Sequence, residues 1–193
     1  MRAGTTMFRH LLSVTLGAAA IAGFMQAANA ADDLEARLQT CGACHGADGK
    51  PISAAIPIIW GQQTAYMVKQ IHDYRAKDRD NAVMTPLAGT IKQEETRKAA
   101  AYFAIKTWPV AHAAAAAATS EPKGMTVCKA CHQPNFEGGL PAPRLAGQSY
   151  EYLVAAMKSF ADETRTNSAD MMRLMKMLTP EERDAMAHYL AGL

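Results

Sequence analysis

The apolar positions of this chain recur with the spacing of α-helices. A helix at the C-terminus would carry on one face Glu182, Met186, Tyr189, Leu190 and Leu193. No segment shows the strict alternation of apolar and polar residues that is typical of a half-buried strand. The pattern therefore predicts an all-α fold.

A capping signal predicts where the C-terminal helix begins. Thr179 is suited to the N-cap, Pro180 to the first helical position and Glu182 to a capping box. Two further helices are predicted over 64–77 and 149–160. The apolar face of the C-terminal helix has an equivalent earlier in the chain, at Ala99, Tyr102 and Phe103.

The sequence contains a duplication. The pentapeptide CGACH at 41–45 recurs as CKACH at 128–132, 87 positions later. The same offset relates four further pairs: Met84 and Met171, Leu87 and Leu174, Glu94 and Glu181, Tyr102 and Tyr189. An offset of 86 relates Pro57 and Pro143, Gly61 and Gly147, Gln62 and Gln148, Tyr66 and Tyr152. These matches indicate two tandem copies of one small helical unit, with one residue of length difference in a loop.

The boundaries of the two copies follow from composition. We expect the first domain over 31–107, a linker over 108–122 and the second domain over 123–193. The linker begins at Trp108-Pro109 and contains the alanine run 113–118. Units of this size have thin cores, and such units commonly need a metal or a cofactor for stability.

The first thirty residues are typical of a secretory signal. Arg2 and Arg9 supply the positive start, residues 11–22 are apolar, and Ala28-Asn29-Ala30 forms a small-x-small cleavage pattern. The apolar run is shorter than the roughly 20 residues that a membrane-spanning helix requires. We therefore predict cleavage after Ala30 and a periplasmic location.

Charge excludes some classes of function. Hydrophobic residues make up 49% of the chain and charged residues 20%, which fits a globular protein. Arg2 and Arg9 are the only charged side chains of the signal segment, and the rest of the chain has equal numbers of basic and acidic groups. This balance argues against a nucleic-acid partner and for at most peripheral membrane association.

The Cys-x-x-Cys-His motif is the attachment signature of a c-type haem. Cys41 and Cys44 lie on one side of a helical turn, where their thiols can add to the two vinyl groups of the porphyrin. His45 would then reach the iron as the proximal ligand. The second copy supplies the same set, Cys128, Cys131 and His132. The motifs predict two covalently bound haem c groups.

Two other uses of the cysteines are possible on the sequence alone. Both pairs could form disulfides or thiol redox couples, although that leaves the His of each motif unexplained. The four Cys could also bind one zinc ion, although 83 residues lie between Cys44 and Cys128.

The chain resembles the dihaem cytochrome c4 family over essentially all of its length after the signal segment. The first copy carries the resemblance in CGACHGADG, PIIWGQ, MTPLAG and QEETRKAAAYFA, and the second in CKACHQP, PRLAGQ, MMRLMKMLTPEE and RDAMAHYL. The resemblance implies two class I cytochrome c folds, each around one haem. Trp60 departs from the family, which usually has a smaller residue at this position.

The sixth iron ligand is expected to be a methionine in each copy. A Met thioether opposite His raises the reduction potential of a haem. Met84 stands where the family places this ligand, and Met67 is assigned to packing. In the second copy four methionines crowd together: Met171, Met172, Met175 and Met177. Register with Met84 favours Met171, with Met172 as the alternative.

The resemblance also implies that the backbone carbonyl at Pro57 and Pro143 orients the proximal His ring. Four paired side chains are candidates either for contacts near the haem carboxylates or for packing: Tyr66, Tyr152, Gln62 and Gln148. We expect Arg79 and Arg165 to be solvated, and no ligand role for His72, His112 and His188.

The resulting hypothesis is an exported electron carrier, not an enzyme, with redox proteins as donors and acceptors. A quinol–cytochrome c oxidoreductase, a terminal oxidase or a dehydrogenase would be such a partner. Three other functions stay open: a dihaem electron-accepting subunit of a dehydrogenase, such as a sulfide-oxidising flavocytochrome; a dihaem peroxidase; and a haem-free thiol protein.

Overall fold

The computed structural model describes residues 34–109 and 120–193. The predicted signal segment, His112 and the alanine run of the linker lie outside the described residues. Gln39–Leu193 form one compact unit, which contains both copies of the repeat. Among the described residues, no helix is long and apolar enough to cross a bilayer.

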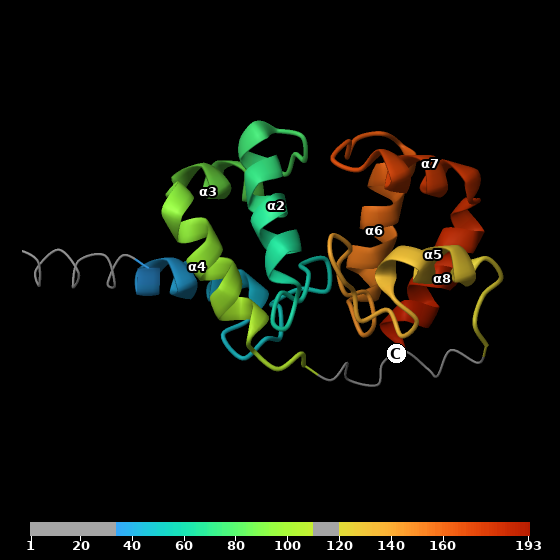
Figure 1. Cartoon of the computed structure of the whole chain (residues 1–193), viewed down its shortest axis with the longest axis horizontal. Helices are drawn as coiled ribbons and strands as arrows, with labels where there is room; N and C mark the ends of the chain where they lie inside the picture. The colour runs from blue at the N-terminus through green and yellow to red at the C-terminus, as the bar shows by residue number, and fades with distance from the viewer. Residues whose placement is uncertain (1–33, 110–119) are drawn as a thin grey trace, which may run out of the picture. The chain divides into compact units, whose positions relative to one another are not determined.

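Each copy consists of four helices in the same order. In the first copy, residues 34–45 are helical and are followed by α2 (Thr64–Ala76), α3 (Met84–Thr90) and α4 (Gln93–Ala104). In the second, α5 (Met125–His132) is followed by α6 (Tyr150–Ala161), α7 (Ala169–Met177) and α8 (Pro180–Ala191). Helix α2 packs against α3 and α4, as α6 packs against α7 and α8 (Figure 1). The predicted all-α fold is confirmed.

The predicted start of the last helix is confirmed. The Thr179 hydroxyl accepts a hydrogen bond from the Glu182 backbone N–H at 3.2 Å, and the Glu182 carboxylate accepts one from the Thr179 N–H at 2.8 Å. Pro180 occupies the first turn of α8, where its missing N–H leaves no hydrogen bond unmade. The predicted apolar face is only partly buried, because Leu193 lies beyond the helix and is 52% exposed.

Buried side chains of α6, α7 and α8 form the core of the second copy. Leu153, Met157 and Phe160 from α6 pack with Met186 and Leu190 from α8. In the first copy the equivalent α4 face buries Ala99 and Phe103, whereas Tyr102 is 37% exposed. Both cores are small, as expected for units that need a bound group for full stability.

Two glutamine side chains join the copies reciprocally. The Gln62 carboxamide donates to the Arg144 carbonyl at 3.0 Å and accepts from the Arg144 N–H at 2.8 Å. The Gln148 carboxamide makes the same two bonds with Ile58, at 3.0 and 2.9 Å. Gln62 and Gln148 are both buried, and both bond the loop that lies between the Cys-x-x-Cys-His helix and the next helix of the other copy.

Candidate haem sites

Both Cys-x-x-Cys-His motifs end a helix. Cys41, Cys44 and His45 lie in the helical residues 34–45, and the second motif forms the last five residues of α5. A spacing of three places the two Cys of each motif on the same side of the helix. The thiols are accessible for attachment, since Cys41, Cys44 and Cys128 are half-buried and Cys131 is exposed.

The two motif histidines are buried and oriented alike. The Nδ1 of His45 lies 2.8 Å from the Pro57 carbonyl oxygen, and the Nδ1 of His132 lies 2.9 Å from that of Pro143. Because a carbonyl only accepts hydrogen bonds, Nδ1 carries the proton and Nε2 has a free lone pair. The expected orienting role of the Pro carbonyls is thus confirmed for the ring geometry.

Burial also keeps these rings neutral. It lowers the pKa of His45 and of His132, against the smaller raising effect of the bonds to Pro57 and Pro143. A neutral imidazole with a free Nε2 is the form that binds a metal. Each copy therefore holds one histidine prepared for ligation.

Met84 is held at the start of α3. The Asn81 carboxamide oxygen accepts hydrogen bonds from the backbone N–H of Val83 at 3.0 Å and of Met84 at 2.9 Å, which fixes the entry into the helix. The Met84 side chain is half-buried. Met67 is instead 8% exposed within α2, in agreement with a packing role.

The methionines of the second copy separate into two classes. Met171 and Met172 are half-buried against the core, whereas Met175 is 3% and Met177 75% exposed. Met171 also lies in the first turn of α7, where its N–H donates to the Ser168 hydroxyl at 3.4 Å. By burial, Met175 belongs to the core and Met177 to the surface, so Met171 and Met172 are the remaining candidates for the iron ligand. Register favours Met171, which stays a prediction.

The prediction that Arg79 and Arg165 are solvated was wrong. Arg165 is 6% exposed and Arg79 is half-buried, and their backbones form an isolated β-bridge. Arg79 donates to the Tyr152 hydroxyl at 3.1 Å, and Arg165 donates to the Tyr66 hydroxyl at 3.3 Å. Both guanidinium groups also donate to the Gln70 carboxamide oxygen at 2.8 Å. The two arginines hold equivalent positions in the copies, and this symmetry was the sequence signal that could have identified them.

This cluster has an excess of positive charge. Within the described ranges, neither guanidinium pairs with a carboxylate; the acceptors are phenols, an amide and, for Arg165, Asn167. Although burial raises the pKa of Tyr152, the charges of Arg79 and Arg165 outweigh it and lower that pKa to about 8. The buried Asp73 carboxylate accepts hydrogen bonds from Gln70 and Asn167, but it is already paired with Lys69. Because buried cations without a paired anion are costly, the two guanidinium groups fit a group that brings carboxylates. The two propionate carboxylates of a haem meet this requirement.

Comparison with known proteins agrees with this chemistry. The family model "Cytochrome c" matches residues 111–193. Cytochrome c4 from Pseudomonas aeruginosa is 32% identical over 94% of this chain and 96% of its own length. A thiosulfate dehydrogenase electron acceptor from Stutzerimonas stutzeri is 31% identical over 79% of this chain and 78% of its own length.

A solved structure extends the similarity to the fold. Reduced recombinant cytochrome c4 from Pseudomonas stutzeri superposes with a TM-score of 0.74 at 26% identity, over 84% of this chain and 97% of that chain. The duplicated helical units, the paired attachment motifs and these similarities agree with one another. The chain belongs to the dihaem cytochrome c4 family, whose members are electron-transfer proteins with covalently bound haem c.

Proposed function

We propose that this protein is an exported carrier that passes single electrons between redox proteins by outer-sphere transfer. In this proposal one iron is bound by His45 and Met84, and the other by His132 and Met171. The observation that carries the proposal is the pair of His–Pro carbonyl hydrogen bonds, at 2.8 and 2.9 Å, because it presents one Nε2 atom in each copy.

In this proposal the residues of each copy attach the haem, bind its iron and orient the iron-binding histidine. Cys41, Cys44 and their counterparts in the second copy tether the group through thioethers. His45 and His132 bind iron through Nε2, and their Nδ1–H bonds fix the ring and increase its basicity. When bound, each haem supplies an iron that gains and loses one electron. If Met84 and Met171 supply the remaining iron ligands, neither iron would have an open position for substrate, which favours transfer without bond formation.

Redox proteins are the proposed partners. The relative named as a thiosulfate dehydrogenase electron acceptor supports a dehydrogenase as the donor. The structure of thiosulfate dehydrogenase (TsdBA) from Marichromatium purpuratum, 36% of whose chain is covered by this one, supports the second candidate function, a dihaem subunit attached to a catalytic partner. Purification from the native host under mild conditions separates the two, since only a subunit would co-purify with a larger protein in fixed ratio.

Ligand substitution tests the iron ligation. Met84→Leu keeps the volume but removes the thioether, and we expect the ferrous protein to bind one equivalent of carbon monoxide. Met67→Leu, in the core of α2, is the control and should bind none. Met171→Leu and Met172→Leu, compared in the same way, identify the ligand of the second copy. Carbon monoxide binding by the unchanged protein would contradict the proposal.

The mass of the mature protein tests whether the signal segment is removed on export. The proposal expects cleavage after Ala30, so the protein from the periplasm of a host that matures c-type cytochromes should begin at Ala31 and carry the mass of two haem groups. A protein that retains residues 1–30 would contradict it.

A further inference from the structure

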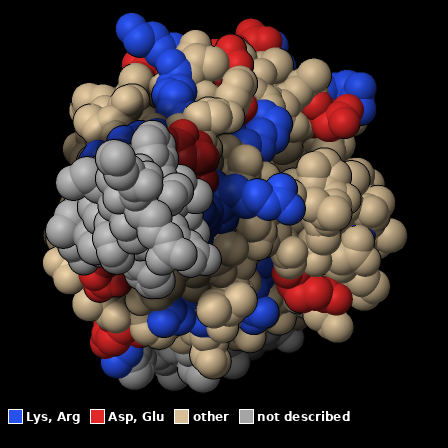
Figure 2. Space-filling view, turned by 60° about the vertical axis from the view of Figure 1, so that its left-hand side comes forward, with Lys and Arg blue, Asp and Glu red and all other residues tan. Residues whose placement is uncertain are grey.

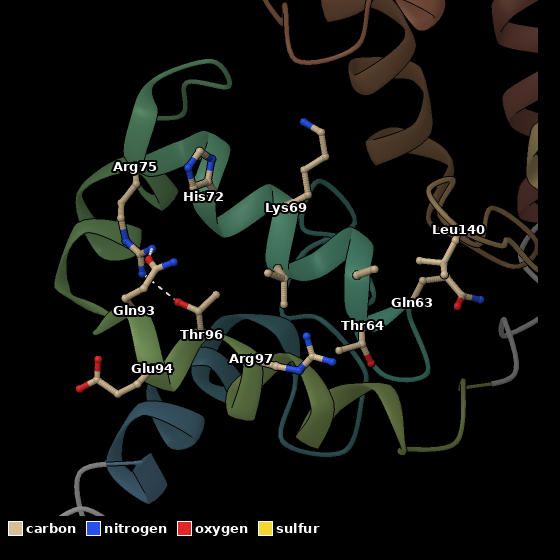
Figure 3. Close-up of a pocket in the computed structure, with 12 residues that line it drawn as sticks. Gln63, Thr64, Lys69, His72, Arg75, Gln93, Glu94, Thr96, Arg97 and Leu140 are labelled. Atoms are coloured by element: carbon tan, nitrogen blue, oxygen red, sulfur yellow. Dashed lines mark hydrogen bonds between the residues drawn. The ribbon is translucent and has the colours of Figure 1, made fainter.

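A groove of the first copy is not used by the proposed electron carrier. It lies between α2 and α4, has a volume of about 860 Å³, and is drawn in Figure 3. Its polar lining includes Lys69, His72, Arg75 and Arg97, and Glu94 is the one acidic residue that lines it. The charged part of the lining is therefore mainly cationic, and Leu140 of the second copy contributes an apolar side chain.

The charges of the groove are only partly neutralised. The Arg75 guanidinium donates to neutral acceptors alone: the Ala88 carbonyl at 3.1 Å, the Ile91 carbonyl at 2.7 Å, Gln93 at 2.8 Å and Thr96 at 2.9 Å. Arg97 is exposed and bonds none of the described residues. Lys69 donates to the Asp73 carboxylate at 2.5 Å and to the Asn167 carbonyl at 3.1 Å, but its own side chain is 47% exposed. Its four hydrogen bonds hold the Arg75 guanidinium in one position at the side of the groove, whereas the exposed Arg97 side chain is available to an external anion.

The second copy has different residues at the positions equivalent to the groove. Tyr150, Asp184 and His188 occupy the positions equivalent to Thr64, Arg97 and Ala101. The Tyr150 ring stacks on His188 with centroids 4.0 Å apart, and its hydroxyl donates to the Asp184 carboxylate. A carboxylate and an aromatic ring thus contact each other between α6 and α8. In the first copy a small residue and an arginine stand in their place.

The nitrogen-bearing side chains of the open groove do not converge on one point. Figure 3 shows Lys69 and His72 projecting from α2 in different directions, whereas Arg97 extends from α4 toward Thr64. One small anion could therefore not contact all of them. A chain segment with several carboxylates, lying along the groove, could pair with each in turn.

We propose that this groove binds an acidic segment of a partner protein, with Asp or Glu side chains placed against Arg97 and Lys69. That the partner is a redox protein rests on the proposed function; the binding itself does not. Basic and acidic side chains are interspersed on the face in Figure 2, so specificity would come from the groove and not from a field of one sign.

The experiment uses the haem-loaded protein and a fluorescent hexaglutamate peptide, with binding measured by anisotropy at low salt. Arg97→Asp, which introduces the residue of the second copy, should weaken binding about three- to tenfold. Lys98→Asp is the matched control, because Lys98 is exposed on the same helix but does not line the groove. Its effect should be smaller than twofold.

Shape is tested separately from charge. Thr64→Tyr narrows the groove without a change of charge and should also weaken binding of the peptide. Equal effects of Arg97→Asp and Lys98→Asp, or no effect of Thr64→Tyr, would overturn the proposal. So would inorganic phosphate that competes at the peptide's own concentration, since the site would then hold a small anion. Loss of haem ligation would appear in the visible spectrum, so a failure of the proposed function is distinguishable.

Discussion

Trp60 lies directly on Gly49, so closely that a Cβ on Gly49 would stand 2.8 Å from the Trp60 Cδ2 atom. Gly49 has a φ of 85°, in the left-handed region. In the second copy the equivalent positions hold Phe136 and Ala146, both buried. The large aromatic ring therefore stands at the second position of the pair in the first copy (Trp60) and at the first position in the second copy (Phe136). This exchange explains how the first copy accommodates Trp60 where the family has a smaller residue.

The exchange predicts that Gly49→Ala destabilises the protein. The left-handed backbone alone costs a non-glycine residue about 1–2 kcal/mol, and the clash with the Trp60 ring adds to it. Gly89→Ala is the control, because no atom lies within 4 Å of a Cβ at this helical position. Denaturant unfolding of the haem-loaded protein measures both. An equal stability of the two variants would disprove the contact.

The reciprocal amide bonds predict that Gln62→Ala and Gln148→Ala each lower the free energy of unfolding. Gln148→Ala leaves the buried backbone N–H and C=O of Ile58 without these partners, and Gln62→Ala does the same to the half-buried groups of Arg144. The cost of each substitution is about 1–3 kcal/mol, and the buried Ile58 groups should give the larger value. Asn135→Ala is the control, since this exposed side chain makes no bond to the other copy. If the Gln variants matched the control in denaturant unfolding, the bonds would not join the copies in solution.

Acid should destabilise the protein through the two motif histidines. Burial lowers the pKa of His45 and His132 in the folded state, and binding of iron at Nε2, as proposed, would lower that pKa further. Below their unfolded pKa of about 6.5 the unfolded chain therefore binds more protons. Their contribution is thus fully present above pH 6.5 and is lost as the pH falls through the lowered folded pKa. As the pH is lowered from 7.5 to 5, the free energy of unfolding should decrease by at most about 1.4 kcal/mol per pH unit for each histidine. A flat profile over this range would contradict the neutral, buried state of both rings.

The arginine cluster should influence the reduction potentials. Arg165→Gln removes a buried positive charge. Loss of this charge stabilises the oxidised haem, which is more positive than the reduced haem, so at least one reduction potential should fall. Potentiometric titration of the haem-loaded protein measures the change. Arg173→Gln, on the exposed surface of α7, should leave both potentials nearly unchanged. Equal potentials in the Arg165 variant and the unchanged protein would place the cluster away from the haem groups.

The fold was predictable because its signals are local or repeated. The capping residues Thr179 and Glu182 and the motif spacing act within single helices, and the offset of 87 residues revealed the duplication. The repeat marks Arg79 and Arg165 as equivalent positions, but it does not reveal that their side chains are buried. Burial of a charged side chain depends on residues of the other copy, such as Tyr152 and Tyr66, and no local pattern records them. Register favours Met171 over Met172, but burial does not separate them, because both side chains are half-buried.

The Gln62 and Gln148 carboxamides bond main-chain groups only, so the side chains of Arg144 and Ile58 are free to differ. Each half of the molecule therefore contains both partners of a self-complementary pair. A single ancestral module with this glutamine could already have formed a symmetric homodimer, and gene fusion would then have made that association permanent.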